Sequence, residues 1–195
     1  LQRRRQRQMC IRDRSNGLKT VYDQFQSATN MTDKTSALNL LINHDKDDTY
    51  ASSALADFYC QYKNENLVVN LWLQLQATNQ QPGGLSRVQS LMEHESFTIK
   101  NPNKVRSLIG SFASSNHFNF HDKLGTGYEF LGEQILKLNT LNPQVAARLV
   151  TPLTRWSDYE EPYANLMKKQ LKVIKASPGL VSDVYEVVTL SLIHI

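Results

Sequence analysis

Two Asn-Pro pairs constrain the fold of this chain more than any other feature of its sequence. Asn101-Pro102 opens the run NPNKVRSLIG, and Asn142-Pro143 opens the run NPQVAARLV. Asn favours the N-cap of a helix because its side-chain oxygen accepts a hydrogen bond from a free backbone N–H. Pro at the next position has its φ angle preset for a helix and loses no hydrogen bond there. Each pair therefore predicts the start of a helix.

Apolar residues at helical spacing recur along the chain from Met31 onward. They predict helices that start near residues 32, 48, 67, 85, 101, 128, 142, 162 and 180. The longest irregular segment expected is Ser114–Gly127. Strand-like alternation is missing, so we expect an all-α protein, a superhelical or solenoid-like array of eight or nine antiparallel helices. Because no strict repeat of about 33 to 47 residues is visible, ankyrin, TPR and HEAT arrays are not predicted.

The composition is that of a globular protein with a core of its own. The 195 residues are enough for one domain. No apolar run approaches the roughly 20 residues of a membrane span, and no signal peptide is recognisable. The two cysteines, Cys10 and Cys60, form no disulfide or metal-binding pattern, which favours the cytoplasm. We expect the Cys60 thiol to be buried, because aromatic residues flank it on a predicted helix.

The positive charge is concentrated at the start of the chain. Residues 1–14 contain six Arg and one Asp, whereas the remainder is close to neutral. Such an arm is typical of nucleic-acid binding. However, RRRQRQMCIRDR resembles translated sequencing-adapter sequence, and so does the final run SLIHI. We therefore expect residues 1–15 and 190–195 to be artefactual tails around one domain of residues 16–189, a fragment without a nucleic-acid partner.

A search for catalytic patterns finds no complete site. The H-E-x-x-H motif of zinc peptidases is missing, and so is the G-x-S-x-G elbow of serine hydrolases. His117 and His121 have the spacing of metal ligands on a helix. A loop is expected there, so a polar surface is the preferred interpretation. Gly125-Thr126-Gly127 is interpreted as a flexible lead into the next helix. We assign neither a catalytic residue nor a metal ligand.

Gln144 and Arg148 are the side chains that point most clearly to binding. They are four residues apart, so a helix stacks them on one face. A guanidinium matches a carboxylate, and the Gln amide both donates and accepts. Arg106 and Arg148 each follow an Asn-Pro start within two turns, where the helix dipole disfavours a cation. A ligand or a structural salt bridge can account for these arginines.

Three runs in a fixed order carry a resemblance to a known family. NPNKVRSLIGSFA, GTGYEFL and LNPQVAARLVTPL together resemble the C-terminal helical domain of bacterial aminopeptidase N, a zinc-dependent family, and the similarity extends more loosely from Val21 to Val188. The resemblance implies a superhelical bowl that covers the catalytic domain and encloses the route to the zinc. It also implies that Gln144, Arg148 and Arg106 line the substrate cavity.

The resemblance implies a function for the intact protein. We expect a zinc metalloaminopeptidase that removes N-terminal residues from peptides, with metal-bound water attacking the first peptide bond. The zinc belongs to the missing catalytic domain, so this part alone is expected to bind no zinc and to be inactive. Its partners are then peptides and that domain, without nucleic acid or membrane. The alternative is a free-standing α-solenoid that binds a protein or peptide.

Overall fold

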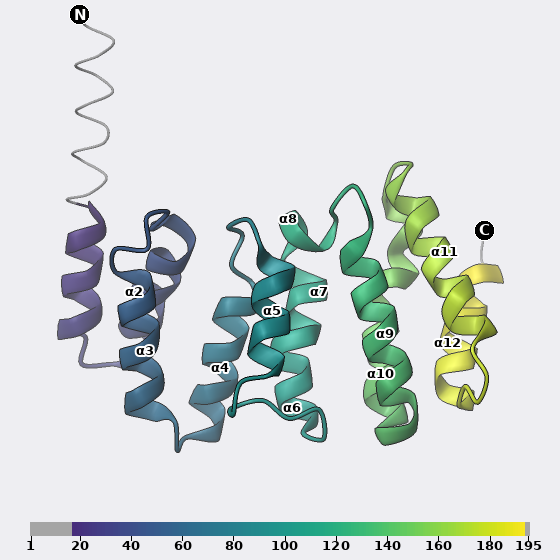
Figure 1. The fold of residues 1–195 in the computed structure, drawn as a ribbon, viewed down its shortest axis with the longest axis horizontal. Helices are drawn as coiled ribbons and strands as arrows, with labels where there is room; N and C mark the ends of the chain where they lie inside the picture. Colours follow the sequence, from purple (N-terminus) through teal and green to yellow (C-terminus); the bar gives the residue numbers. More distant parts are fainter. Residues whose placement is uncertain (1–16, 194–195) are drawn as a thin grey trace, which may run out of the picture. The chain divides into compact units, whose positions relative to one another are not determined.

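The computed structural model describes residues 17–193 (Figure 1). Every regular element in that range is helical, which confirms the all-α class. After a helix over residues 17–27, the elements are α2 (Met31–His44), α3 (Ala51–Tyr62), α4 (Asn66–Ala77), α5 (Gly84–Met92), α6 (Pro102–Val105), η1 (Arg106–Gly110), α7 (Ser111–Ser115), α8 (His117–Phe120), α9 (Thr126–Leu141), α10 (Pro143–Thr154), η2 (Arg155–Asp158), α11 (Tyr163–Ala176) and α12 (Ser182–Ile193).

The ends of the chain bear on the predicted tails. The tail predicted at residues 1–15 and Cys10 lie outside the described residues. Residues 190–193, which were predicted to belong to a tail, form the last turn of α12. The boundaries 16–189 stay a prediction. Within residues 17–193, no helix is both long and apolar enough to cross a membrane.

The chain divides into two compact units, with the boundary between Leu75 and Gln76 inside α4. In the first unit, α2 and α3 pack together through fully buried apolar side chains such as Leu38, Leu41 and Phe58. The Asp45 carboxylate accepts hydrogen bonds from the backbone N–H groups of Tyr50 and Ala51, so it caps the start of α3.

The prediction for Cys60 was wrong, because this residue is free and exposed. Cys60 is two residues after the buried Phe58, which places it on the other side of α3. Its aromatic neighbours in the sequence therefore do not cover it.

The second unit is built around α9. Buried residues occur on most of its circumference, among them Phe130, Leu131, Ile135 and Leu138. Helices α10 and α11 pack against it, and α12 packs against both of them (Figure 1). The Asn139 side chain donates to the Gly179 carbonyl and accepts from the Val181 N–H, which fastens α9 to the turn before α12.

The segment expected to be irregular contains an additional helix. Within residues 114–127, His117–Phe120 form α8. Asn116 is fully buried and caps this turn through the Asn119 N–H, while its amide donates to the carbonyls of Ala77 and Asn79 at 2.8 Å each. The turn is thus fixed by contacts with a distant part of the chain, which apolar periodicity does not report.

Both Asn-Pro pairs start helices, as predicted. The Asn101 Oδ1 accepts from the Asn103 N–H at 3.0 Å, and the Asn142 Oδ1 accepts from the Val145 N–H at 3.2 Å. The helix that starts at Pro102 changes to π-helical bonding over Arg106–Gly110 before it returns to α-helix in α7. The Ser111 N–H closes this wider turn by donating to the Arg106 carbonyl.

Candidate functional site

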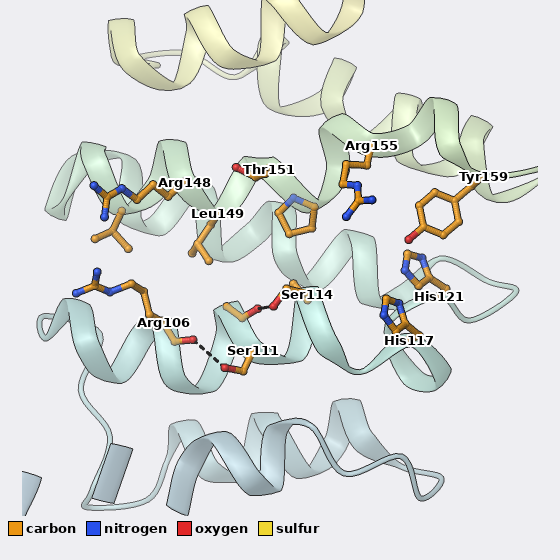
Figure 2. A pocket seen from close by; sticks show the side chains of 14 residues that line it. Arg106, Ser111, Ser114, His117, His121, Arg148, Leu149, Thr151, Arg155 and Tyr159 are labelled. Carbon is orange, nitrogen blue, oxygen red and sulfur yellow. Dashed lines mark hydrogen bonds between the residues drawn. The ribbon is translucent and has the colours of Figure 1, made fainter. Parts of the chain in front are cut away.

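A cavity of about 430 Å³ opens in the second unit between two helical walls (Figure 2). One wall runs from η1 through α7 to α8, and the other runs along α10 into η2. We name them the Asn101 wall and the Asn142 wall, after the Asn-Pro pairs that start their helices. Three arginines and two histidines line the cavity, while none of the described Asp and Glu residues does. Its surroundings are therefore positively charged.

Arg106 and Arg148 lie at one end of the cavity, one on each wall (Figure 2). Arg106 donates from Nε to the Pro102 carbonyl and from Nη2 to the Asn103 Oδ1. The Arg148 side chain has no hydrogen bond or ion pair to any described residue. The third arginine of the cavity, Arg155, forms an ion pair with Asp158, with Nε to Oδ2 at 3.1 Å. Neither guanidinium group at this end therefore pairs with a carboxylate of residues 17–193.

Gln144 lies outside the cavity wall. It is exposed in the first turn of α10, one helical turn before Arg148. The predicted stacking of these two residues on one helix agrees with the structure. Of the three predicted residues, the structure brings Arg106 and Arg148 together around the cavity. That any of the three faces a substrate stays a prediction.

The opposite end of the cavity is formed by rings that the sequence analysis did not select (Figure 2). The imidazoles of His117 and His121 are nearly parallel, with centroids 5.7 Å apart. The Tyr159 ring lies over His121 at a centroid distance of 4.5 Å. All three side chains line the cavity. The four-residue spacing of the histidines was a usable signal, but it was set aside because α8 was not expected.

Burial sets the protonation of this end. Loss of solvent, with a smaller contribution from His117, lowers the pKa of His121 to about 4. Burial, helped by Tyr159, Asp122 and Tyr163, raises the pKa of Tyr128. At neutral pH His121 is therefore neutral and Tyr128 is a phenol. Their Nδ1 and Oη atoms are 2.7 Å apart, and we assign this bond as O–H···Nδ1, which leaves the ring proton on Nε2.

Between its two ends, the cavity is lined by hydroxyl groups and by irregular backbone. Ser111 and Ser114 donate to the carbonyls of Arg106 and Gly110, so their oxygens keep acceptor capacity. Pro152 lies inside α10 and has no N–H to donate to the Arg148 carbonyl four residues earlier. Each wall thus departs from regular α-helical bonding beside the cavity, once by a π turn and once by a proline.

The side chains present do not fit a zinc site. Nowhere in residues 17–193 do three or more His, Cys, Asp or Glu residues gather as metal ligands would. His117 and His121 form only a pair, whereas protein zinc sites use three or four ligands.

Comparison with known proteins identifies similar domains. Residues 3–193 match the family described as a domain of unknown function (DUF3458_C) with ARM repeats, in agreement with the solenoid-like array expected. Aminopeptidase N of Haemophilus influenzae is 39% identical over 175 residues, which are 87% of this chain and 19% of that protein. Aminopeptidase N of Escherichia coli is 38% identical over 172 residues, 88% of this chain and 20% of that protein.

A solved structure shows the same fold. The crystal structure of Legionella pneumophila aminopeptidase A in complex with aspartic acid matches with a TM-score of 0.88 and 34% identity over 94% of this chain and 21% of that chain. The chain thus spans about a fifth of the length of the curated relatives it matches.

Proposed function

Because the chain belongs to the family of ARM-repeat domains described as DUF3458_C, and because the relatives it matches are aminopeptidases, we propose that it is the C-terminal domain of a zinc-dependent aminopeptidase that removes N-terminal residues from peptides. The observation that carries the proposal is the identity of 38% or 39% to aminopeptidase N over most of the chain.

The proposal divides the work between this domain and the rest of the enzyme. Zinc binding and cleavage of the peptide bond are assigned to the part of the relatives that this chain does not match, because the described residues provide no ligand set for the metal. This domain encloses the active-site cavity and restricts which peptides enter it. Expressed alone, it hydrolyses nothing.

The positively charged end of the cavity supports a role in holding peptides. Arg106 and Arg148 lie on opposite walls, and neither guanidinium has a carboxylate partner in the part of the chain that the structure describes. A guanidinium binds a carboxylate through two parallel hydrogen bonds, which gives both strength and orientation. Gln144, one turn earlier on α10, extends the polar face toward the peptide backbone. These three residues form the substrate-facing side of the domain in our proposal.

We place the enzyme in the cytoplasm. The exposed free thiol of Cys60 suits a reducing compartment, where it stays unpaired. Its partners in this proposal are peptide substrates and the catalytic domain, without nucleic acid or membrane.

The experiment that tests the proposal is a domain exchange. The segment of Escherichia coli aminopeptidase N that matches this chain is replaced by residues 16–189, and hydrolysis of alanyl-p-nitroanilide is measured. We expect activity within about tenfold of the parent enzyme, a change in barrier of about 1.4 kcal/mol or less. The 195-residue chain alone should show none. A chimera with an unrelated helical-repeat domain of similar length is the matched control and should be inactive.

Two results would contradict the proposal. One is zinc-dependent hydrolysis by the chain alone, which would place a catalytic centre within it. The other is a chimera that folds and binds zinc as the parent does but stays inactive. If that chimera is inactive while the isolated chain still binds peptides, the free-standing peptide-binding module becomes the better description.

A further inference from the structure

The distance between the two ends of the cavity fixes the size of a ligand that reaches both. Arg148 lies at the positively charged end, and Arg155 lies at the end with the rings (Figure 2). They are two helical turns apart, which corresponds to about 10 Å at about 1.5 Å per residue. An extended peptide advances about 3.3 Å per residue, so about three residues span the cavity.

We propose that this cavity binds the last three residues of a peptide, with the terminal carboxylate between Arg106 and Arg148 and an aromatic side chain of the third residue from the end against His121 and Tyr159. This inference rests on the proposed function and specifies the class of peptide that the domain holds. It also gives the peptide a direction, from the rings toward the arginines.

The charges of the cavity favour a carboxylate over any cation. Arg106 and Arg148 approach the same end from different helices, so one carboxylate can receive hydrogen bonds from both. The third arginine, Arg155, is already paired with Asp158 and therefore competes less for the anion. None of the described residues that line the cavity is acidic, so a basic residue of the ligand gains no ion pair from them.

The rings at the other end offer flat apolar faces. Tyr159 and His121 are inclined by 30°, and His121 is almost parallel to His117. Aromatic rings prefer such offset or tilted neighbours at centroid distances of about 4.5 to 7 Å. Because His121 is neutral at pH 7, an apolar ring entering there does not have to desolvate a charged imidazole. An aromatic side chain therefore fits this end better than a charged or small one.

The middle of the cavity supplies partners for the peptide backbone. The Thr151 hydroxyl lines the cavity and has no hydrogen bond to any of the described residues. The oxygens of Ser111 and Ser114 keep acceptor capacity, because each hydroxyl uses its proton on a helical carbonyl. These groups can pair with the N–H and C=O groups of an extended tripeptide, which carry no information about its side chains.

Binding of short peptides to the full 195-residue chain tests this inference. The probes are acetyl-Phe-Ala-Ala, the same peptide with a C-terminal amide, and acetyl-Ala-Ala-Phe, measured by isothermal titration calorimetry. We expect acetyl-Phe-Ala-Ala to bind at least about tenfold more tightly than either of the others. Equal affinity for the acid and the amide would overturn the carboxylate site. Equal or tighter binding of acetyl-Ala-Ala-Phe would overturn the direction of the peptide.

Two substitutions separate the ends of the cavity. Arg148→Gln should abolish the preference for acid over amide and keep the preference for Phe at the third position. Tyr159→Leu, which keeps an apolar side chain, should abolish the preference for Phe at the third position and keep the preference for acid over amide. Lys169→Gln removes a cation from the exposed face of α11, outside the cavity, and should change neither preference. If Arg148→Gln binds the acid and the amide as the parent chain does, the inference is wrong.

The outcome is separable from that of the domain exchange. An active chimera whose isolated domain shows no preference for the acid would refute only this tripeptide site. If the chimera is inactive but the isolated chain binds acetyl-Phe-Ala-Ala selectively, the proposed enzyme role is refuted and the tripeptide site is supported. Circular dichroism and thermal unfolding of each variant verify that a lost preference does not reflect a lost fold.

Discussion

The Asn101 wall and the Asn142 wall start alike and then diverge. Each begins with an Asn cap and a Pro, and each carries an Arg within two turns. The Asn101 wall widens into a π turn at Arg106 and ends in the short helix with the two histidines. The Asn142 wall stays α-helical for twelve residues although Pro152 interrupts its bonding. The same start signal therefore does not dictate how a helix continues.

The difference shows which forces act after the first turn. Helix α10 packs against both α9 and α12, so burial of Val145, Leu149 and Val150 keeps it helical through the proline. On the Asn101 wall, Leu108 and Ile109 are both fully buried within the π turn. A π turn shifts the positions that follow it around the helix, so tertiary packing decides which side chains reach the cavity.

The substitution with the largest expected effect on stability is at Gly127, which packs against the end of α8 in the Asn101 wall. A Cβ at Gly127 would lie 2.4 Å from the Phe120 carbonyl oxygen at the end of α8. Because both groups belong to the backbone, Gly127→Ala must displace α8 from α9, and we expect a loss of about 3 kcal/mol in the free energy of unfolding. Urea denaturation measures this loss.

Gly110→Ala is the matched control for that substitution. The nearest neighbour of a Cβ at Gly110 would be the Leu149 side chain at 3.7 Å, which is ordinary contact distance. Ala also has the higher helix propensity, so stability should be unchanged or higher by up to about 1 kcal/mol. A Gly127→Ala variant as stable as Gly110→Ala would show that α8 is not held in place by this contact.

The two caps provide a more symmetrical comparison. Asn101→Ala and Asn142→Ala each remove a hydrogen bond to a backbone N–H in the first turn, so each should lower the free energy of unfolding by about 1 kcal/mol. Asn→Asp at either position keeps the acceptor and should preserve stability. If one Ala variant is neutral while the other is not, the two starts are equivalent only in sequence.

The smallest expected effect is the contribution of His121, at the end of the Asn101 wall, to the pH dependence of stability. Burial lowers the pKa of His121 to about 4 from 6.5. Between these values the unfolded chain binds the proton more tightly, so stability falls as the pH drops from about 6.5 toward 4. With allowance for partial solvent exposure, we expect at most about 1 kcal/mol.

His121→Gln isolates this contribution. The pH dependence of the free energy of unfolding, measured for both proteins, should differ between pH 4 and 6.5. Burial raises the pKa of Asp122, but hydrogen bonds from Thr126 and from backbone N–H groups outweigh burial and lower that pKa overall. Asp122 therefore changes the pH dependence of stability mainly below its ordinary pKa of 3.8. Parallel pH profiles between pH 4 and 6.5 would show that His121 is not desolvated.

Most of the helices could be predicted from the sequence, whereas only two of the residues that line the cavity were singled out. Asn caps and apolar spacing are local signals, so most helix starts were close to those observed. Arg106 and Arg148 were singled out because the helix dipole disfavours an Arg near a helix start, and the family resemblance implied a cavity role for them and for Gln144, which stays a prediction. The π turn and α8 were not found, since one depends on packing behind Leu108 and Ile109 and the other on a buried Asn116 bonded to distant carbonyls.

The ring end of the cavity was missed for the same reason. Without α8, His117 and His121 looked like exposed polar residues of a loop. Tyr159 follows η2 and gave no signal of its own, because its proximity to His121 arises only in the folded chain. Cys60 shows the converse error, since aromatic neighbours in sequence do not bury a residue on the other face of a helix.

The continuity of the cavity in the sequence has a consequence for how such domains diversify. Every residue on its wall comes from one uninterrupted stretch, from Arg106 to Tyr159. A single recombination event that exchanges this stretch between two related genes would transfer both ends of the pocket together. Specificity could then be inherited as a block, while the helices on either side continue to drift independently.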